Sequence, residues 1–299
     1  MQIRDLEIFK KVYEFNSVTQ AAEYLGYTQS AVSSCIKRLE VELECPLFNR
    51  VNRGITPTRY GDNLYRQAGV LLDNIDSLKS TIRETGEITG SLNITCAESA
   101  CSRFMPECVA IFQKHNPKVQ VTIRMQNEDC LMALTRMESD FVLTLMPEFD
   151  QGALQQIMKR PLKFKLYRAA GKDISGIREL KEVASERLLY GTGYSAFDSM
   201  LKDEFMKKGL VPNYMTFCDN VFTLERMCSL DVGICLLPEY IAEEFVARGE
   251  IKEIEIKDLD ISMYSYIYAL KGRSLSPRTV SFLRMLYEMY DDIEKYIDL

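Results

Sequence analysis

The chain has 299 residues, of which 46% are hydrophobic and 27% charged, the composition of a soluble globular protein with two or three domains. Its formal net charge of −6 excludes a protein that coats nucleic acid over its whole surface. Residues 1–66 carry 9 Lys or Arg against 8 Asp or Glu, whereas the remainder carries 28 against 35, so a local basic patch near the amino end could still bind DNA.

Two further features bear on compartment and metal binding. No apolar run approaches the length of a membrane span, and Arg4, Asp5 and Glu7 interrupt what would be the apolar region of a signal peptide. The nine cysteines form no Cys-x-x-Cys pair and the single histidine is His115, which is poor zinc chemistry. We therefore expect a cytoplasmic protein without membrane association, metal or cofactor, whose thiols are reduced and mostly buried.

The first 45 residues predict three short helices. A first helix that ends near Asn16 has one apolar face, made of Leu6, Phe9, Val12 and Tyr13. Residues 17–40 predict two more helices joined at Gly26, which permits a sharp bend at no steric cost. Small alanines at 21 and 22 let these helices cross closely, as a helix-turn-helix requires.

The last of these helices has two contrasting faces. Thr28 can cap its start, and an apolar stripe at spacings of 4, 3 and 4 residues runs along Val32, Ile36, Leu39 and Leu43. The other face offers amide, hydroxyl and ammonium groups from Gln29, Ser30, Ser33, Ser34 and Lys37. Such a helix suits the major groove of DNA. An ordinary helical hairpin with a solvated polar face is the alternative.

The segment after this helix predicts a basic hairpin. Pro46 ends the helix, because the residue before a proline is pushed out of helical conformation. Residues 47–58 then predict a strand, a turn at 52–54 and a return strand, with Arg50 and Arg53 beside the turn. A basic hairpin next to a recognition helix is typical of a wing that contacts phosphates or the minor groove, rather than of a solvated loop.

A long helix is predicted from Thr58 to about Glu87. Its apolar residues recur at spacings of 4, 3, 4, 3 and 4, in the order Leu64, Ala68, Leu71, Ile75, Leu78 and Ile82. That heptad seam indicates pairing with a second helix, hence a dimer. Gly86 and Gly90 mark the exit from the helix.

Beyond Gly90 strands and helices alternate. The first series has strands at 92–96, 119–125 and 141–145, which indicates a βαβαβ unit with a largely parallel sheet. A second series follows Pro161, with strands at 164–167, 188–190, 214–217, 233–236 and 265–269. Helices are expected at 197–207, 222–230, 239–247 and 277–289, the last of them packing back on the first series.

The whole chain resembles a LysR-type transcriptional regulator. The resemblance is most specific in one block near the amino end, made of Thr19-Gln20-Ala21-Ala22, Thr28-Gln29-Ser30-Ala31-Val32-Ser33, Ile36, Leu39-Glu40, Leu47-Phe48-x-Arg50, Arg53 and Thr58-x-x-Gly61. It is weaker at Val232-Gly233-Ile234-Cys235-Leu236-Leu237-Pro238, where Asp231 replaces the first glycine of the family segment.

The resemblance implies an α plus α/β fold. Its parts would be a winged helix-turn-helix DNA-binding domain (1–60), a dimerising linker helix (61–89) and a two-subdomain effector domain of the periplasmic-binding-protein type (90–299). Subdomain I would comprise 90–162 plus 268–299, and subdomain II would comprise 163–267.

The polar helix face, the wing and the family block together give ten expected DNA-contact residues: Thr19, Thr28, Gln29, Ser30, Ser33, Ser34, Lys37, Arg38, Arg50 and Arg53. The family commonly has Arg at the position of Ser34 and often Pro at that of Ser30, which puts one phosphate or guanine contact in doubt. Lys37 and Arg38 would partly replace it, and Gln29 and Ser33 are the expected base readers.

The effector site is expected at the carboxyl ends of strands, beside helix amino ends. The first candidate is the loop of Ala97, Glu98, Ser99 and Ala100, where the family often places a Ser or Thr that binds the effector's polar group. Thr144, Thr192, Tyr194 and Ser195 face the same cleft in the family picture, although each could instead be a cap or turn residue. A small polar or anionic effector is favoured, and Glu98 disfavours a second negative group, so that a zwitterion is conceivable.

The resulting hypothesis is a DNA-binding regulator and not an enzyme, switched by a small-molecule co-inducer. Its partners would be double-stranded DNA and a second copy of itself through the linker helix, with a dimer of dimers (a homotetramer) implied by the family. RNA polymerase stays open as a further partner.

Two alternatives are weighed against this hypothesis. A redox sensor could use Cys218, Cys228 and Cys235, but peroxide-sensing relatives place their reactive pair in a segment that corresponds to 191–210, where this chain has no cysteine. A solute-binding module without DNA function is opposed by the winged amino-terminal segment.

Overall fold

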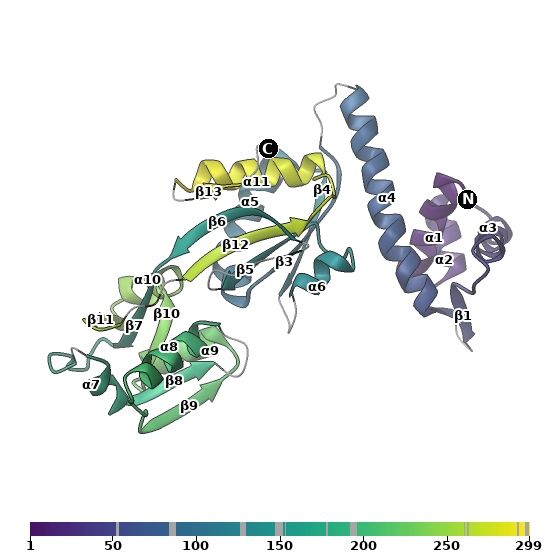
Figure 1. Ribbon diagram of the computed structural model, residues 1–299. Coiled ribbons are helices and arrows are strands. Elements are labelled where there is room, and N and C mark those ends of the chain that lie inside the picture. Colours follow the sequence, from purple (N-terminus) through teal and green to yellow (C-terminus); the bar gives the residue numbers. More distant parts are fainter. Residues whose placement is uncertain are drawn as a thin grey trace.

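The computed structural model describes residues 1–51, 54–83, 88–125, 130–146, 152, 154–177, 179–191, 196–259, 261, 263–291, 293–296 and 299. Figure 1 shows a small helical head, one long helix beside it and an α/β half with two sheets. The predicted fold class is confirmed. Within the described ranges, no helix is long and apolar enough to cross a membrane.

The head is built from α1 (Ile3–Phe15), α2 (Val18–Leu25) and α3 (Gln29–Glu42). Their apolar faces meet in one core that contains Phe9, Val12, Ala21, Val32 and Leu39. Gly26 ends α2 with a φ of +70°, a backbone conformation that glycine adopts without steric cost. The polar face of α3 is therefore left outward by the same pattern that buries its apolar face.

The wing pairs β1 (Phe48–Val51) with β2 (Gly54–Pro57) as antiparallel strands. Glu40 of α3 holds it in place, since its Oε1 accepts hydrogen bonds from the backbone N–H groups of Leu47 (2.8 Å) and Phe48 (3.3 Å). Gly61, on the next helix, packs against the start of the wing, since an added Cβ would lie 2.3 Å from the carbonyl oxygen of Leu47. The glycine of the Thr58-x-x-Gly61 motif is thus required by close packing of the wing on the next helix.

That next helix is α4 (Arg59–Arg83), about 37 Å long at 1.5 Å per residue. Its first turns pack on the head, where Ala68 and Leu72 contact Leu6 of α1. Further along the predicted seam, Leu71 and Leu78 are 47% and 60% exposed. The predicted end of the helix at Glu87 lies outside the described residues.

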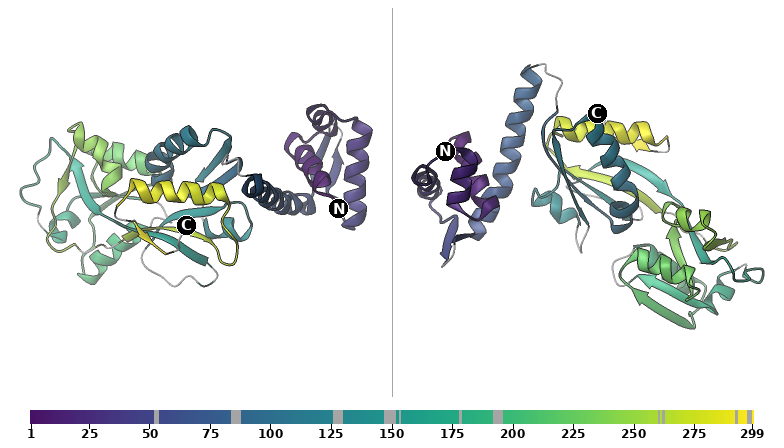
Figure 2. Two further views of the ribbon diagram at one scale, coloured as in Figure 1. Left: turned by 90° about the horizontal axis from the view of Figure 1, so that it is seen from above. Right: turned by 180° about the vertical axis from the view of Figure 1, so that it is seen from behind.

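The larger sheet has the strand order β13-β6-β12-β5-β3-β4. The predicted strands β3 (Gly90–Cys96), β4 (Val119–Met125) and β5 (Phe141–Met146) are parallel to one another, and β12 (Met263–Leu270), β6 (Leu154–Leu162) and β13 (Glu294–Lys295) extend the sheet as antiparallel strands. One face is covered by the π-helical segment η1 (Ala100–Phe104), α5 (Met105–His115) and α11 (Pro277–Met289), and the other by α6 (Cys130–Thr135) (Figures 1 and 2). We call this part the six-stranded subdomain.

The smaller sheet has the order β11-β7-β10-β8-β9 and forms what we call the five-stranded subdomain. Its strands are β7 (Phe164–Ala169), β8 (Arg187–Gly191), β9 (Tyr214–Cys218), β10 (Ile234–Pro238) and β11 (Ile251–Ile254). On one face lie α7 (Leu180–Ala184) and α8 (Ala196–Lys207), and on the other lie α9 (Val221–Ser229) and α10 (Glu239–Ala247).

Three details differ from the sequence-based expectation. Strand β6 was not predicted because polar residues and Pro161 interrupt its pattern; Pro161 is exposed near the strand end, opposite Tyr264. Helix α7 and strands β11 and β13 were also not predicted, since each spans five residues or fewer. The chain was expected to re-enter subdomain I at residue 268, which lies inside β12. Because β12 pairs with β6 along its whole length, the chain has already re-entered this subdomain at Met263.

The family departure at Asp231 has a backbone explanation. Asp231 has a φ of +62°, in the left-handed region that glycine adopts most easily and where Asp is among the better tolerated side chains. Two residues on, a Cβ at Gly233 would lie 2.5 Å from the carbonyl oxygen of Arg187. The second glycine of the segment therefore cannot be replaced as easily as the first.

Candidate DNA-binding surface and effector cavity

The polar residues of α3 form one exposed surface. Gln29, Ser30, Ser33, Ser34 and Lys37 are all exposed, while Val32, Cys35, Ile36 and Leu39 on the opposite side are buried. Thr28 caps the helix by accepting a hydrogen bond from the N–H of Ala31 (3.2 Å), and its hydroxyl lies 3.1 Å from that of Ser30. The structure thus brings six of the ten predicted DNA-contact residues together on one exposed surface, made of α3 and its N-cap residue Thr28.

Arg38 is held differently from its neighbours. Its guanidinium donates a hydrogen bond to Asp5 of α1 although the side chain is 59% exposed. Burial alone would raise the pKa of Asp5, but hydrogen bonds from the Gln2 backbone, Arg38 and the Cys35 thiol together lower it below its usual value. In the free protein Arg38 therefore ties α3 to α1.

The remaining predicted DNA contacts lie elsewhere. Thr19 is exposed in the first turn of α2. Arg50 is on β1, opposite Ile55, with its side chain outside the described part of the structure. Arg53 falls at the wing turn, outside the described residues.

The expected effector loop contacts the five-stranded subdomain. The hydroxyl of Tyr240, on α10, donates a 2.7 Å hydrogen bond to the Oγ of Ser99, which is 4% exposed. Glu98 accepts hydrogen bonds from the Asn220 side chain and from the N–H of Val221 (3.4 Å), at the amino end of α9. Burial raises the pKa of Glu98 despite these hydrogen bonds. Both polar side chains of the loop thus bridge the two subdomains.

The other predicted effector residues are not gathered at one point. Ala100 lines a cavity described below, and Ala97 donates its N–H to the carbonyl of Leu143 at 2.9 Å. Thr144 is buried and lies on β5 between Leu143 and Leu145, so it points to the opposite sheet face from those two residues. Thr192, Tyr194 and Ser195 lie outside the described residues.

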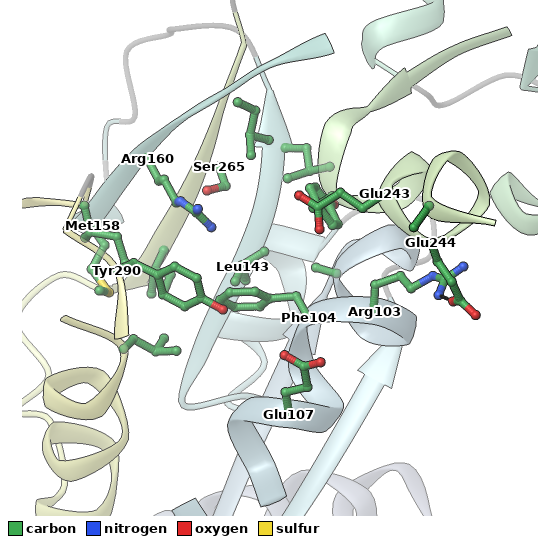
Figure 3. Close-up of a pocket in the computed structure, with 18 residues that line it drawn as sticks. Arg103, Phe104, Glu107, Leu143, Met158, Arg160, Glu243, Glu244, Ser265 and Tyr290 are labelled. Carbon is green, nitrogen blue, oxygen red and sulfur yellow. Dashed lines mark hydrogen bonds and ion pairs between the residues drawn. The ribbon is translucent and has the colours of Figure 1, made fainter. Parts of the chain in front are cut away.

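A cavity of about 550 Å³ opens between η1, α10, α11 and the face of the six-stranded sheet (Figure 3). Its walls are mostly apolar, from Ala100, Phe104, Leu143, Leu145, Met158, Leu162, Ile267, Leu286 and Ile293. Figure 3 shows the rings of Phe104 and Tyr290 side by side, with centroids 5.2 Å apart. A cavity of this size and lining suits a small organic molecule with a ring.

Charged groups enter this cavity from several elements. The guanidinium of Arg160 points into it from β6 and lies 4.3 Å from the ring centroid of Tyr290, while Glu107 and Glu243 are exposed at its edge (Figure 3). Arg103 turns away toward the five-stranded subdomain, where it pairs with Glu244 and, at 3.5 Å, with Glu225. Arg160 is therefore the cation that faces the cavity most directly.

Glu225 is an unusual partner for Arg103. It is 1% exposed, and burial raises its pKa to about 6 although Arg103 opposes the shift. Among the described residues, neither the Oε1 of Glu225 nor the Nε of Arg103 has a hydrogen-bond partner. The pair is buried at the junction of the subdomains but incompletely satisfied.

Sequence reasoning missed the cavity residues Arg103, Arg160, Tyr240 and Tyr290. They come from four separate segments, and only their proximity in the fold reveals them. The one available signal was Tyr240, which follows the family-like segment that ends at Pro238. Within the described residues, no group of three or more His, Cys, Asp or Glu could hold a metal ion.

The redox alternative through Cys218, Cys228 and Cys235 is not favoured. Cys228 and Cys235 are 0% and 1% exposed, and burial raises the pKa of Cys235 far above its usual range. A buried protonated thiol reacts poorly with oxidants.

A winged helix-turn-helix on a long helix, followed by two α/β sheets, is the architecture of a DNA-binding transcriptional regulator with a substrate-binding domain. Family models agree: the model described as "Bacterial regulatory helix-turn-helix protein, lysR family" matches residues 3–62, and "LysR substrate binding domain" matches residues 85–291. The chain belongs to the LysR family of transcriptional regulators.

Individual relatives and structures are consistent with this family. The regulator CzcR of Bacillus subtilis is 27% identical over 290 residues, covering 96% of this chain and 98% of its own. A full-length OxyR variant from Pseudomonas aeruginosa has a TM-score of 0.72 at 15% identity, covering 100% and 99% of the two chains. ArgP from Mycobacterium tuberculosis has a TM-score of 0.66 at 17% identity, with 95% of each chain covered. At these identities the structural likeness concerns the fold alone.

Proposed function

We propose that this LysR-type regulator responds to a small organic acid that binds in the cavity beneath η1. The observation that carries the proposal is a cavity of about 550 Å³ whose walls come from both subdomains. Apolar side chains would cover the body of the molecule, and Arg160 would bind one carboxylate. Glu107 and Glu243 at the edge disfavour a second acidic group and would accept an ammonium group, in keeping with an anion or a zwitterion.

Ser99 would act in this site through Tyr240. The Tyr240 ring lines the cavity and its hydroxyl donates to Ser99, so a ligand that displaces the ring would alter a bond between the subdomains. A ligand that binds one arrangement of the subdomains more tightly shifts the population toward it. We propose the same bridging role for Glu98, whereas Thr144, Thr192, Tyr194 and Ser195 remain candidates for the cleft.

The DNA half of the proposal rests on the exposed face of α3. Gln29 and Ser33 would read base edges, with Thr19, Thr28, Ser30, Ser34, Lys37, Arg38, Arg50 and Arg53 as further contacts. The division into a DNA-binding domain (1–60), a linker helix (61–89) and an effector domain (90–299) accompanies this assignment.

We further propose that two copies pair along α4. Leu71 and Leu78 are exposed apolar residues on one seam, which a second helix would cover. Pairing would place two recognition helices on successive turns of DNA. Assembly into a dimer of dimers, contact with RNA polymerase, a cytoplasmic location and the absence of enzymatic activity complete the proposal.

The cavity assignment is tested by thermal shift of the purified full-length protein with benzoate, phenylalanine and phthalate as matched ring compounds. We expect the monocarboxylates to raise the melting temperature and the dicarboxylate to have no effect. Arg160→Gln should abolish the shift, whereas Lys114→Gln, on an exposed position of α5 outside the cavity lining, should retain it. Equal shifts with all three compounds, or shifts that persist in Arg160→Gln, would contradict the assignment.

Gel shift on the DNA upstream of its own coding region, at two salt concentrations, tests DNA binding separately.

A further inference from the structure

Cys96 and Cys101 lie together at the start of the segment that bridges the subdomains. Cys96 is the last residue of β3 and Cys101 is the second residue of η1. Their Sγ atoms are 2.7 Å apart, closer than unbonded sulfurs normally approach and not far from the ~2.05 Å of an S–S bond. Both are free thiols.

The two thiols differ in accessibility and in charge. Cys96 is 0% exposed, whereas Cys101 is partly exposed and its thiol faces the carbonyl of Arg124 at 3.6 Å. The hydrogen bond between the two thiols lowers the pKa of Cys101, while the pKa of Cys96 is raised by the same bond and by burial. A partly exposed thiol of lowered pKa beside a buried thiol is the arrangement of an attacking and a resolving cysteine.

We propose that Cys96 and Cys101 are a peroxide-oxidisable dithiol that closes to an intramolecular disulfide. The Cys101 thiolate attacks one oxygen of hydrogen peroxide, the O–O bond breaks, and hydroxide leaves and takes up a proton as water. The Cys96 sulfur then attacks the Cys101 sulfenic acid, and its thiol proton leaves with the departing hydroxide as a second water. Two thiols and one peroxide thus give one disulfide and two waters.

A second cysteine pair in the same chain serves as an internal comparison. Cys228 and Cys235 also share a hydrogen bond, which contributes to the raised pKa of Cys235, but both are almost fully buried. The disulfide of Cys96 and Cys101 would fix the first turn of η1 to the end of β3, next to Ala100 and Arg103 of the cavity. The buried pair offers an oxidant no comparable access.

Trypsin separates the two pairs cleanly. Cleavage after Arg83 and Arg103 gives peptide 84–103 with only Cys96 and Cys101, and cleavage after Arg226 and Arg248 gives peptide 227–248 with only Cys228 and Cys235. Peptide 209–226 carries the single Cys218. Each pair can therefore be followed by mass spectrometry within one peptide.

The experiment treats the folded full-length protein with hydrogen peroxide and removes the peroxide. The remaining thiols are then alkylated under denaturing conditions, so that buried thiols also react, and the protein is digested without reductant. In peptide 84–103 we expect a disulfide to form, which blocks alkylation of both cysteines and lowers the peptide mass by two hydrogens. This change should be at least ~10-fold faster than in peptide 227–248, and reduction should restore both alkylation sites. In Cys96→Ser, Cys101 should be trapped by a sulfenic-acid reagent, and in Cys101→Ser, Cys96 should stay alkylatable. The proposal is overturned if peptide 84–103 stays fully alkylated, if Cys101 oxidises while Cys96 remains free, or if peptide 227–248 closes equally fast.

Discussion

Asp5 in the head and Glu225 between the subdomains are both buried carboxylates that pair with an arginine, yet their pKa values shift in opposite directions. Asp5 is 3% exposed and accepts hydrogen bonds from a backbone N–H, from Arg38 and from the Cys35 thiol, which together overcome the effect of burial. Glu225 is 1% exposed, and its hydrogen bonding within the described residues is a single 3.5 Å contact with Arg103. Several fixed donors stabilise a buried charge, and one distant donor does not.

The comparison separates a rigid region from one suited to rearrangement. The bond between Arg38 and Asp5 joins α1 to α3 and helps to fix the surface that we assign to DNA. The bond between Arg103 and Glu225 joins η1 to α9 across the subdomains and leaves Oε1 of the carboxylate without a partner among the described residues. We expect the loss of this second bond to cost less than the loss of the first.

The largest expected effect follows from removing each carboxylate. Asp5→Ala removes the carboxylate that accepts from the Gln2 backbone N–H and from the Arg38 guanidinium, and it leaves the buried Cys35 thiol only the 4.0 Å contact with the backbone carbonyl of residue 5. It should lower the free energy of unfolding of the head by about 2–3 kcal/mol. At pH 4.5, where Glu225 is protonated in the folded state, Glu225→Gln keeps the shape of the acid and should change the stability of the effector half by less than about 1 kcal/mol. Hydrogen exchange of α1 and α9 in the full chain measures both, and an equal loss in the two variants would remove the distinction.

A second prediction concerns substitutions that weaken DNA binding while the head stays folded. Gln29→Ala changes an exposed side chain at the start of α3, so stability should be unchanged. Binding to the preferred operator should weaken by about 1–3 kcal/mol, with relaxed preference at one base pair. Lys37→Ala, on the same face, should instead weaken all sequences alike and reduce the salt slope by about 1. Gel shifts on a panel of operator variants decide; unchanged preference in Gln29→Ala would show that α3 reads DNA with other residues.

The head could be predicted from the sequence and the cavity could not, because the head depends on neighbouring residues and the cavity on residues far apart in the chain. The head could be derived from its sequence because Gly26, Thr28 and the apolar stripe of α3 act on neighbouring residues, and burial of one face leaves the other outward. The cavity could not, because Arg103, Arg160, Tyr240 and Tyr290 meet only after two sheets have formed. Ser99 was found from the family resemblance, but its partner Tyr240 lies 141 residues away.

The two carboxylates should make stability depend on pH in opposite directions. The pKa of Glu225 is raised from 4.5 to about 6 in the folded state, so the native state holds this proton more tightly than the unfolded state. Stability of the effector half should therefore fall as the pH rises from 4.5 to 6, by up to about 2 kcal/mol. Asp5 has a pKa below 3.8, so its contribution is present above that value and is lost as the pH falls through the lower folded pKa.

Hydrogen exchange of α9 across pH 4 to 7, corrected for the intrinsic exchange rate, measures the first of these effects. Glu225→Gln is the matched control and should remove the slope, since glutamine does not titrate. A slope that persists in this variant would assign the effect to another group, and a slope of the opposite sign would show that Arg103 dominates over burial.

The smallest expected effect concerns the hydrogen bond between Tyr240 and Ser99. Tyr240→Phe and Ser99→Ala each remove one partner of a single part-buried hydrogen bond, so each should cost about 1 kcal/mol. Because the two groups bond to each other, the double variant should cost little more than either single one. The diagnostic result is the ligand response: both single variants should bind DNA as the unaltered protein does, yet lose the change in DNA binding on addition of a cavity ligand. Additive stabilities with a retained ligand response would mean that this bond joins the subdomains without transmitting what occupies the cavity.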